Sequence, residues 1–306
     1  MLYDNTVVIL LSLFCHMGSS RPFIFSLLLI FLPGLEESKA DVNVTTSVRP
    51  LQLIAQAIVE DRGEVTAVID GQDSPHHYSL TPSDRLNLQR ADLLLWISPE
   101  FEVQLSDVFA ALADEKPVLA ATEVTGISLL SLSGDHIDPH LWLNSANAIV
   151  IAKSLAENLQ EIDSVNSVEY QNAFSRFEAN ISRIKLEIGQ QLSAVDSTDY
   201  VVFHDAYQYF EKEFALGSGL VLVNNAEAQP SMRELLRFRN DLRARSPSCI
   251  LLEPDSNLEL VASALENRNL PRETVDLLGY EIEDGSGAYG ELMLGVAAAF
   301  DACLSN

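Results

Sequence analysis

The chain has 306 residues, of which 47% are hydrophobic, and a formal charge of −25 at pH 7. This length predicts about two domains, and the apolar fraction is ample for their cores. The acidic balance excludes nucleic acid as a partner, because the phosphate backbone binds basic surfaces. An acidic surface does not identify a cation carrier by itself, since it serves solubility equally well.

The first 40 residues are typical of a signal peptide. Arg21 precedes an apolar stretch over 22–32, and Ser38-Lys39-Ala40 has the small-residue pattern of a cleavage site. The stretch is too short for a firm assignment as a membrane span. A second apolar run lies before Met17, which we interpret as the true start of the protein. Lipidation of Cys15 is the less favoured alternative. We therefore expect residues 1–40 to direct export.

Two cysteines remain after this segment, Cys249 and Cys303. An even number of cysteines in an exported chain favours a disulfide. Two buried thiols are the alternative.

Apolar runs alternate with helical patterns in residues 41–163, which we assign to an N-terminal lobe. This alternation is typical of a parallel sheet with crossover helices. The pattern predicts strands at 42–46, 65–69, 92–97 and 117–121, and helices at 50–60 and 81–89.

A long helix is predicted over 167–194, within a linking segment at 164–195. Its apolar residues are three or four positions apart and share one helix face. At 1.5 Å per residue the helix would be about 42 Å long, which is enough to connect two lobes. A coiled-coil homodimer is the alternative, but the pattern is too brief to favour it. The shared face consists of Tyr170, Phe174, Phe177, Ile181, Ile184, Ile188 and Leu192.

The alternation resumes in residues 196–306, the expected C-terminal lobe. The fold class is therefore α/β, with two parallel-sheet lobes joined by one long backbone helix. The predicted strands are 200–203, 221–224, 249–252 and 274–278, and the predicted helices are 231–245, 258–266 and 291–303.

Three histidines lie near the ends of apolar runs: His76, His140 and His204. Ligands of parallel α/β folds bind outside the carboxyl ends of strands, so a cleft between the lobes could collect all three. Three imidazoles plus one further ligand complete a tetrahedral zinc site. Any one of them alone would more simply be an ordinary core or helix-start histidine.

Several nearby polar residues have two interpretations. Asp276 follows a late strand and could be the fourth ligand or could cap a turn. Asp138 and Asp205 could orient the imidazoles or cap turns. We expect His77 to point away from the metal and His136 to be exposed to solvent.

The chain resembles the periplasmic zinc-binding proteins of high-affinity zinc ABC uptake systems over residues 42–306. The resemblance implies two α/β lobes around a bound metal, with His76, His140 and His204 as the zinc ligands. It also implies a disulfide between Cys249 and Cys303. The matching segments are Thr45-Thr-Ser-Val-Arg-Pro-Leu51, His76-His-Tyr-Ser-Leu-Thr-Pro-Ser-Asp84, Ala91-Asp-Leu-Leu-Leu-Trp96, Pro139-His-Leu-Trp-Leu143, Val202-Phe-His-Asp-Ala-Tyr207, Tyr209-Phe-Glu211, Glu227-Ala-Gln-Pro230 and Glu253-Pro254.

Two departures from the family pattern affect the site. The long histidine-rich loop of several members is reduced here to residues 123–137, with His136 as its one histidine. Pro75 stands where some members carry a glutamate that can reach the metal, so the fourth ligand is water or Asp276. Manganese-type relatives use a carboxylate at the third position, and His204 therefore argues for zinc.

These features predict the periplasmic solute-binding component of a zinc ABC importer, which captures Zn²⁺ and delivers it to a membrane permease. We expect a monomer without enzymatic activity. A manganese-binding or adhesin-like member of the same superfamily is one alternative. A zinc hydrolase is another, because three histidines and a water also form catalytic sites. The sequence shows no adjacent glutamate to act as the base of such an enzyme.

Overall fold

The computed structural model describes residues 41–69, 78–132, 136–193, 195, 199–224 and 229–305. The predicted signal peptide, His76 and His77 lie outside the described residues. None of the described helices combines the length and the apolar character needed to cross a membrane.

The first half of the chain forms a parallel four-stranded sheet in the order β2-β1-β3-β4. The central strand β3 is buried along its whole length, as a parallel sheet covered on both faces requires. The sheet confirms the four predicted strands, with shifts of one or two residues at their ends. The strands are β1 (Val42–Val48), β2 (Gly63–Ile69), β3 (Leu93–Trp96) and β4 (Val118–Ala120).

Helices cover this sheet, and their starts follow from local sequence. Helix α2 begins at a capping box in which Thr81 and Asp84 exchange hydrogen bonds between side chain and backbone. Helices α3 and α4 were missed by the sequence analysis. The signal for α4 was present, because Asn144 caps it by accepting from the backbone N–H of Asn147. The helices are α1 (Arg49–Val59), α2 (Pro82–Arg90), α3 (Val103–Leu112) and α4 (Ser145–Ile162).

The second half repeats the architecture with a parallel sheet in the order β6-β5-β7-β8. The last strand was predicted at 274–278, but it ends at Thr274 because the chain turns around the Asp276 carboxylate. The strands are β5 (Val201–His204), β6 (Leu220–Val223), β7 (Ile250–Leu252) and β8 (Arg272–Thr274). The helices are α6 (Gln208–Glu213), α7 (Met232–Arg245), α8 (Leu258–Ala264) and α9 (Ala288–Leu304).

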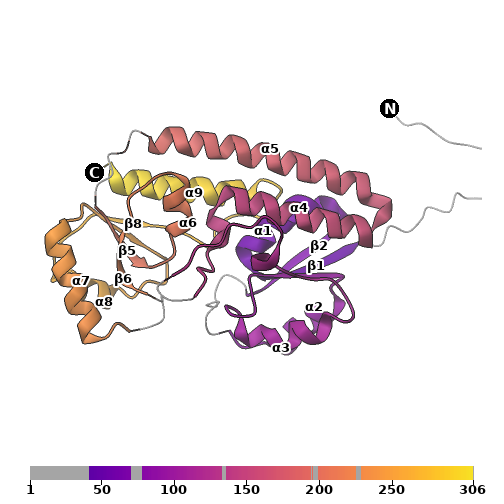
Figure 1. Ribbon diagram of the computed structural model, residues 1–306, viewed down its shortest axis with the longest axis horizontal. Coiled ribbons are helices and arrows are strands. Elements are labelled where there is room, and N and C mark those ends of the chain that lie inside the picture. Colours follow the sequence, from indigo (N-terminus) through magenta and orange to yellow (C-terminus); the bar gives the residue numbers. More distant parts are fainter. Residues whose placement is uncertain are drawn as a thin grey trace, which may run out of the picture. The chain divides into compact units, whose positions relative to one another are not determined.

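The long helix α5 (Ser167–Leu192) connects the two halves and confirms the predicted linking helix. All seven of its predicted face residues are buried. They pack in one apolar core together with residues of both sheets and of α9. Figure 1 shows α5 lying alongside α4 and α9. The apolar face of α5 is therefore used inside the chain, which removes the basis for a coiled coil through that face.

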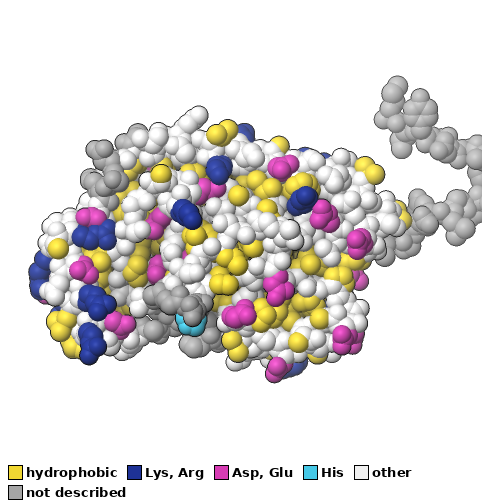
Figure 2. Space-filling view, in the orientation of Figure 1, with side chains coloured by type: hydrophobic (Ala, Val, Ile, Leu, Met, Phe, Trp, Pro, Cys, Tyr) yellow, Lys and Arg dark blue, Asp and Glu magenta, His cyan; other side chains and the backbone are white. Residues whose placement is uncertain are grey.

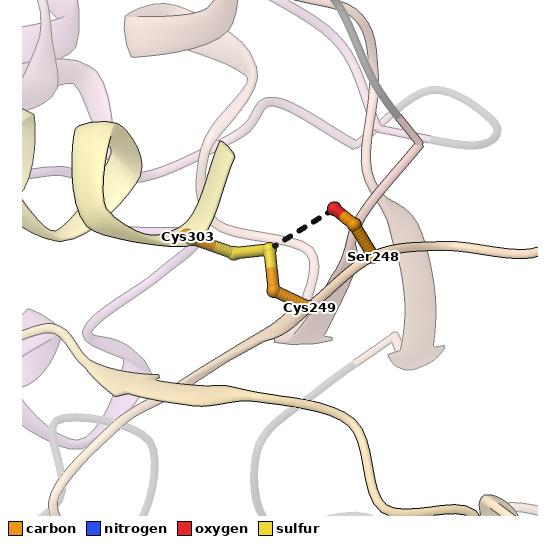
Figure 3. Close-up of a disulfide and its surroundings, with 3 residues drawn as sticks. All are labelled: Ser248, Cys249 and Cys303. Carbon is orange, nitrogen blue, oxygen red and sulfur yellow. Dashed lines mark hydrogen bonds between the residues drawn. A yellow bond between two sulfur atoms is a disulfide. The ribbon is translucent and has the colours of Figure 1, made fainter. Parts of the chain in front are cut away.

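A disulfide joins Cys249, which directly precedes β7, to Cys303 in the last turn of α9 (Figure 3). Their Cα atoms are 5.5 Å apart, within the usual range for a disulfide. Both cysteines are fully buried. The bond confirms the predicted pairing and ties the closing helix to the second sheet.

Removing this disulfide should destabilise the protein without abolishing metal binding. The bond closes a loop between residues 54 positions apart, for which the chain-entropy model gives at most roughly 4 kcal/mol. Urea unfolding of a Cys249→Ser/Cys303→Ser variant should show a lower free energy of unfolding. Zinc titration should still give one site, since neither sulfur is a proposed ligand. Two free thiols in the untreated exported protein would contradict this prediction.

Candidate metal centre

Two of the three predicted histidines face each other. His204 is the last residue of β5, and His140 directly precedes the 3₁₀ turn η3 (Leu141–Leu143). Their Nε2 atoms are 3.3 Å apart, and each residue is only 6% exposed. The face drawn in Figure 2 accordingly shows little histidine surface. Residues from the two halves of the chain thus meet at one point.

The ring of His140 is held by Asp138. The Nδ1 atom of His140 lies 2.8 Å from the Asp138 carboxylate, which also accepts the backbone N–H of His140 at 3.0 Å. Asp138 is fully buried, and its backbone carbonyl accepts from the Tyr209 hydroxyl. A carboxylate on Nδ1 places the proton of a neutral ring there and leaves the Nε2 lone pair free. Asp138 thus fits both interpretations given above, since it orients the ring and also accepts a backbone N–H two residues on.

The ring of His204 lies at ion-pair distance from Glu253 and makes no hydrogen bond to Asp205. Glu253 directly follows β7, and its Oε1 lies 3.1 Å from Nδ1 of His204. The same carboxylate accepts from the Tyr207 hydroxyl at 2.6 Å and from the Ser256 hydroxyl at 3.2 Å. The sequence offered one signal for this role, a glutamate directly after a buried strand. The sequence analysis assigned no role to Glu253.

Asp205 lies close enough to both histidines to interact with their charges. Burial raises the pKa of Asp205, the charge of Asp138 raises it further, and the two histidines act in the opposite direction. Within the described residues no hydrogen bond joins Asp205 to either ring. Asp205 instead lines a pocket together with Tyr207 and Ser131.

The charge of the His204–Glu253 pair is set by their contact. Burial lowers the pKa of His204, but the surrounding carboxylates, Glu253 foremost, together raise it by more, so the net pKa lies above the ordinary value. Burial raises the pKa of Glu253, and His204 together with the hydrogen bond from Tyr207 reverses this, so its net pKa lies below the ordinary value. In the metal-free protein this contact therefore favours a protonated imidazole beside an ionised carboxylate.

The distance between the two Nε2 atoms fits a shared metal ion. Zinc binds imidazole nitrogen at about 2.0–2.1 Å, and the tetrahedral angle then separates two such nitrogens by about 3.3 Å. The observed separation is 3.3 Å. With both Nδ1 atoms facing carboxylates, two neutral rings would point lone pairs at each other. A cation or a proton between them removes that repulsion.

The third predicted ligand, His76, lies outside the described residues, so its role stays a prediction. Among the residues that the structure does describe, no group of three or more His, Cys, Asp or Glu side chains is arranged to hold a metal. His136 is exposed, as predicted, in the loop joined by the Ser131–Ile137 bridge.

Asp276 is engaged in a turn. Its Oδ1 accepts the backbone N–H groups of Leu278 at 3.1 Å and Gly279 at 2.7 Å, and its Oδ2 accepts that of Glu281 at 3.1 Å. Gly279 has a φ of +72°, a conformation that glycine adopts most easily. These bonds favour the turn-capping interpretation, and the role of Asp276 as fourth ligand stays a prediction.

Replacing Asp276 with asparagine distinguishes these two roles. Because three backbone N–H groups occupy the carboxylate, we expect zinc affinity to change by less than about threefold. Stability should fall by about 1 kcal/mol, the usual contribution of one hydrogen bond. Zinc titration and urea unfolding of Asp276→Asn measure the two effects. A tenfold or larger loss of affinity would instead identify Asp276 as the fourth ligand.

The chain has two α/β lobes built on parallel sheets, a long connecting helix and a buried imidazole pair between the lobes. These features define a metal-binding solute-binding protein. Residues 44–303 match the family model described as zinc-uptake complex component A periplasmic, ZnuA, and the chain belongs to this family.

Named relatives agree with this assignment. The high-affinity zinc uptake system protein ZnuA of Haemophilus ducreyi is 28% identical over 294 residues, covering 87% of this chain and 94% of the relative. Its counterpart in Brucella suis is 24% identical over 307 residues, covering 86% and 92%. The crystal structure of a ZnuA deletion mutant with zinc bound superposes with a TM-score of 0.75 at 22% identity. It covers 87% of this chain and 99% of that one, which shows the shared fold.

Proposed function

We propose that this protein binds Zn²⁺ in the periplasm and delivers it to the membrane permease of an ABC importer. The observation that carries the proposal is the His140–His204 pair, whose Nε2 atoms have the separation of two nitrogens on one tetrahedral zinc ion. The buried setting and the carboxylate behind each ring pre-orient both donors. Imidazole ligands favour zinc over the harder manganese ion.

The proposed site joins two lobes that we place at residues 41–163 and 196–306, with 164–195 as the linking helix. His140 belongs to the first lobe and His204 to the second, so a bound ion holds the lobes together. We assign the third position to His76 and the fourth to water or Asp276. The protein would act as a monomer, because one chain supplies all of these donors.

The family and its named relatives are substrate-binding transport proteins. Hydrolysis by zinc-bound water requires a base aimed at that water. Among the described residues, Asp138 and Glu253 face the Nδ1 atoms of the rings at 2.8 and 3.1 Å, and Asp205 makes no hydrogen bond to either ring. We therefore propose transport without catalysis.

Isothermal titration of the metal-free exported protein should give one tight zinc site per chain, with manganese binding more weakly in competition. The physical reason is a single imidazole cluster, assembled from donors that suit zinc. No tight site, or two or more, would contradict the proposal. Hydrolysis of test esters or phosphoesters by the zinc-loaded protein would instead support the enzymatic alternative.

A further inference from the structure

Helix α7 concentrates positive charge on an otherwise acidic chain. Five of the 19 Lys and Arg residues lie within its 14 positions, beside two carboxylates, although the whole chain has a net charge of −25. Figure 2 shows Lys and Arg side chains gathered over the end of the molecule where Figure 1 draws α7 in orange. Acidic side chains lie among them there, and further acidic groups are spread over the rest of that face. This local reversal of charge calls for an explanation.

Three of the five arginines are used by the fold. Arg239 donates to the carbonyl of Ser263 at 2.8 Å, and Arg243 pairs with Glu266, which lies just beyond α8. Arg245 donates to Asp199 at 2.7 Å. These contacts anchor α7 to its surroundings and give these three arginines a structural role.

The other two arginines, Arg233 and Arg237, are exposed and make no hydrogen bond or ion pair with any residue that the structure describes. Next to them lie Met232, which is 69% exposed, and Leu236, which is 52% exposed. Met232 and Leu236 are four residues apart, and so are Arg233 and Arg237. The four side chains are therefore neighbours on one face of the helix. We call Met232, Arg233, Leu236 and Arg237 the α7 patch.

The opposite face of α7 is the one that stabilises the lobe. Phe238 and Leu242 are buried in the apolar cluster of the second sheet, and Leu235 packs against that cluster. The α7 patch therefore adds nothing to this core. A groove between edge strand β6 and α7 adjoins the patch and is lined in part by Arg237 together with Glu234 and Asp241.

We propose that the α7 patch is a docking surface for a carboxylate-bearing region of the membrane permease. This inference rests on the proposed transport function. Exposed arginine beside methionine is a composition typical of protein interfaces, and guanidinium groups bind carboxylates through two parallel hydrogen bonds. The remaining surface is acidic and would repel an acidic partner, so the patch would also set the orientation of docking.

Anionic lipid headgroups offer a second source of negative charge. The observations favour a protein partner. A chain with a charge of −25 is repelled by an anionic bilayer, and two arginine side chains attract anions only at short range.

Uptake measurements test this proposal. In the source organism with its own gene deleted, the full-length chain should restore zinc uptake. The charge-reversed variant Arg233→Glu/Arg237→Glu should reduce uptake by about tenfold or more, because like charges then meet at the interface. Its dissociation constant for zinc, measured with a competing dye, should stay unchanged. A matched control is Lys153→Glu/Arg183→Glu, whose side chains are 61% and 62% exposed on α4 and α5; it should leave uptake unchanged.

The outcomes separate the two proposals. Equal uptake by the charge-reversed variant and the wild type would overturn the α7 patch as a docking surface. Failure of the wild-type chain itself to restore uptake would overturn the transport function on which the inference rests. Binding of wild type, but not of the variant, to vesicles of phosphatidylglycerol and phosphatidylcholine would reassign the patch to lipid. If the charge-reversed variant is unstable, Arg233→Gln/Arg237→Gln should still reduce uptake while retaining zinc binding.

Discussion

Replacing His204 with alanine should weaken zinc binding by more than about 100-fold, and His140→Ala should do the same. Each change removes a proposed metal ligand, whereas loss of a group that only orients a ligand costs about 10- to 100-fold. Glu253→Gln should therefore fall within that smaller range, because a glutamine amide could still contact the ring without a charge. Competition with a zinc-binding dye measures all three dissociation constants.

The exposed His136 provides the matched control. His136→Ala removes an imidazole that is exposed to solvent and should leave zinc affinity unchanged. Since His204→Ala leaves the Glu253 carboxylate buried without its partner, circular dichroism and thermal melting must show that the variant is folded. Normal zinc affinity in folded His204→Ala would exclude His204 as a ligand.

A carboxylate at the same position should change metal preference. His204→Glu is expected to weaken zinc binding and to improve manganese relative to zinc, because carboxylate oxygen is the harder ligand. An unchanged order of metals in competition would again argue that His204 does not touch the metal.

Zinc affinity should fall steeply as the pH drops from about 7 to about 5, since neutral imidazoles bind the metal and their ordinary pKa is about 6.5. Glu253 raises the pKa of His204 in the metal-free protein. Protons should therefore begin to compete with zinc for the His204 ring at a pH above the ordinary histidine pKa. More than one proton should be taken up for each zinc ion released.

The raised pKa of His204 also determines how the stability of the metal-free protein depends on pH. A folded pKa above the unfolded value means that the His204–Glu253 contact stabilises the fold fully below about pH 6.5. This contribution is lost as the pH rises through the folded pKa of His204. Zinc affinity instead rises with pH. The increase in melting temperature caused by zinc should therefore grow between about pH 5 and about pH 8.

Calorimetry in buffers of different ionisation enthalpy counts the protons exchanged. Asp276→Asn serves as the comparison, because it removes no imidazole and should not alter the count. A count near zero at about pH 6 would contradict a histidine site.

The sequence by itself determined the parts of this protein that depend on periodicity. Strand positions and the buried face of α5 followed from the spacing of apolar residues, and the apolar run before His204 placed that residue at the end of a strand. His140 lies in a loop before η3 and not at a strand end. The cysteine pair followed from the cysteine count and the family resemblance. The strands and the helix face are local features, because their spacing is recorded in neighbouring residues along the chain.

Tertiary structure decided which polar groups meet. Glu253 reaches His204 because β5 and β7 are adjacent in the sheet, a pairing that spacing along the chain does not reveal. Asp276 has the residue type of a ligand, but the backbone folds around it and takes up its oxygens. Likewise, the sequence shows five arginines on α7, and only the fold distinguishes the three that it uses from the two that it leaves exposed. The physical reason is that a hydrogen bond or ion pair depends on distances of a few ångströms between segments far apart in sequence.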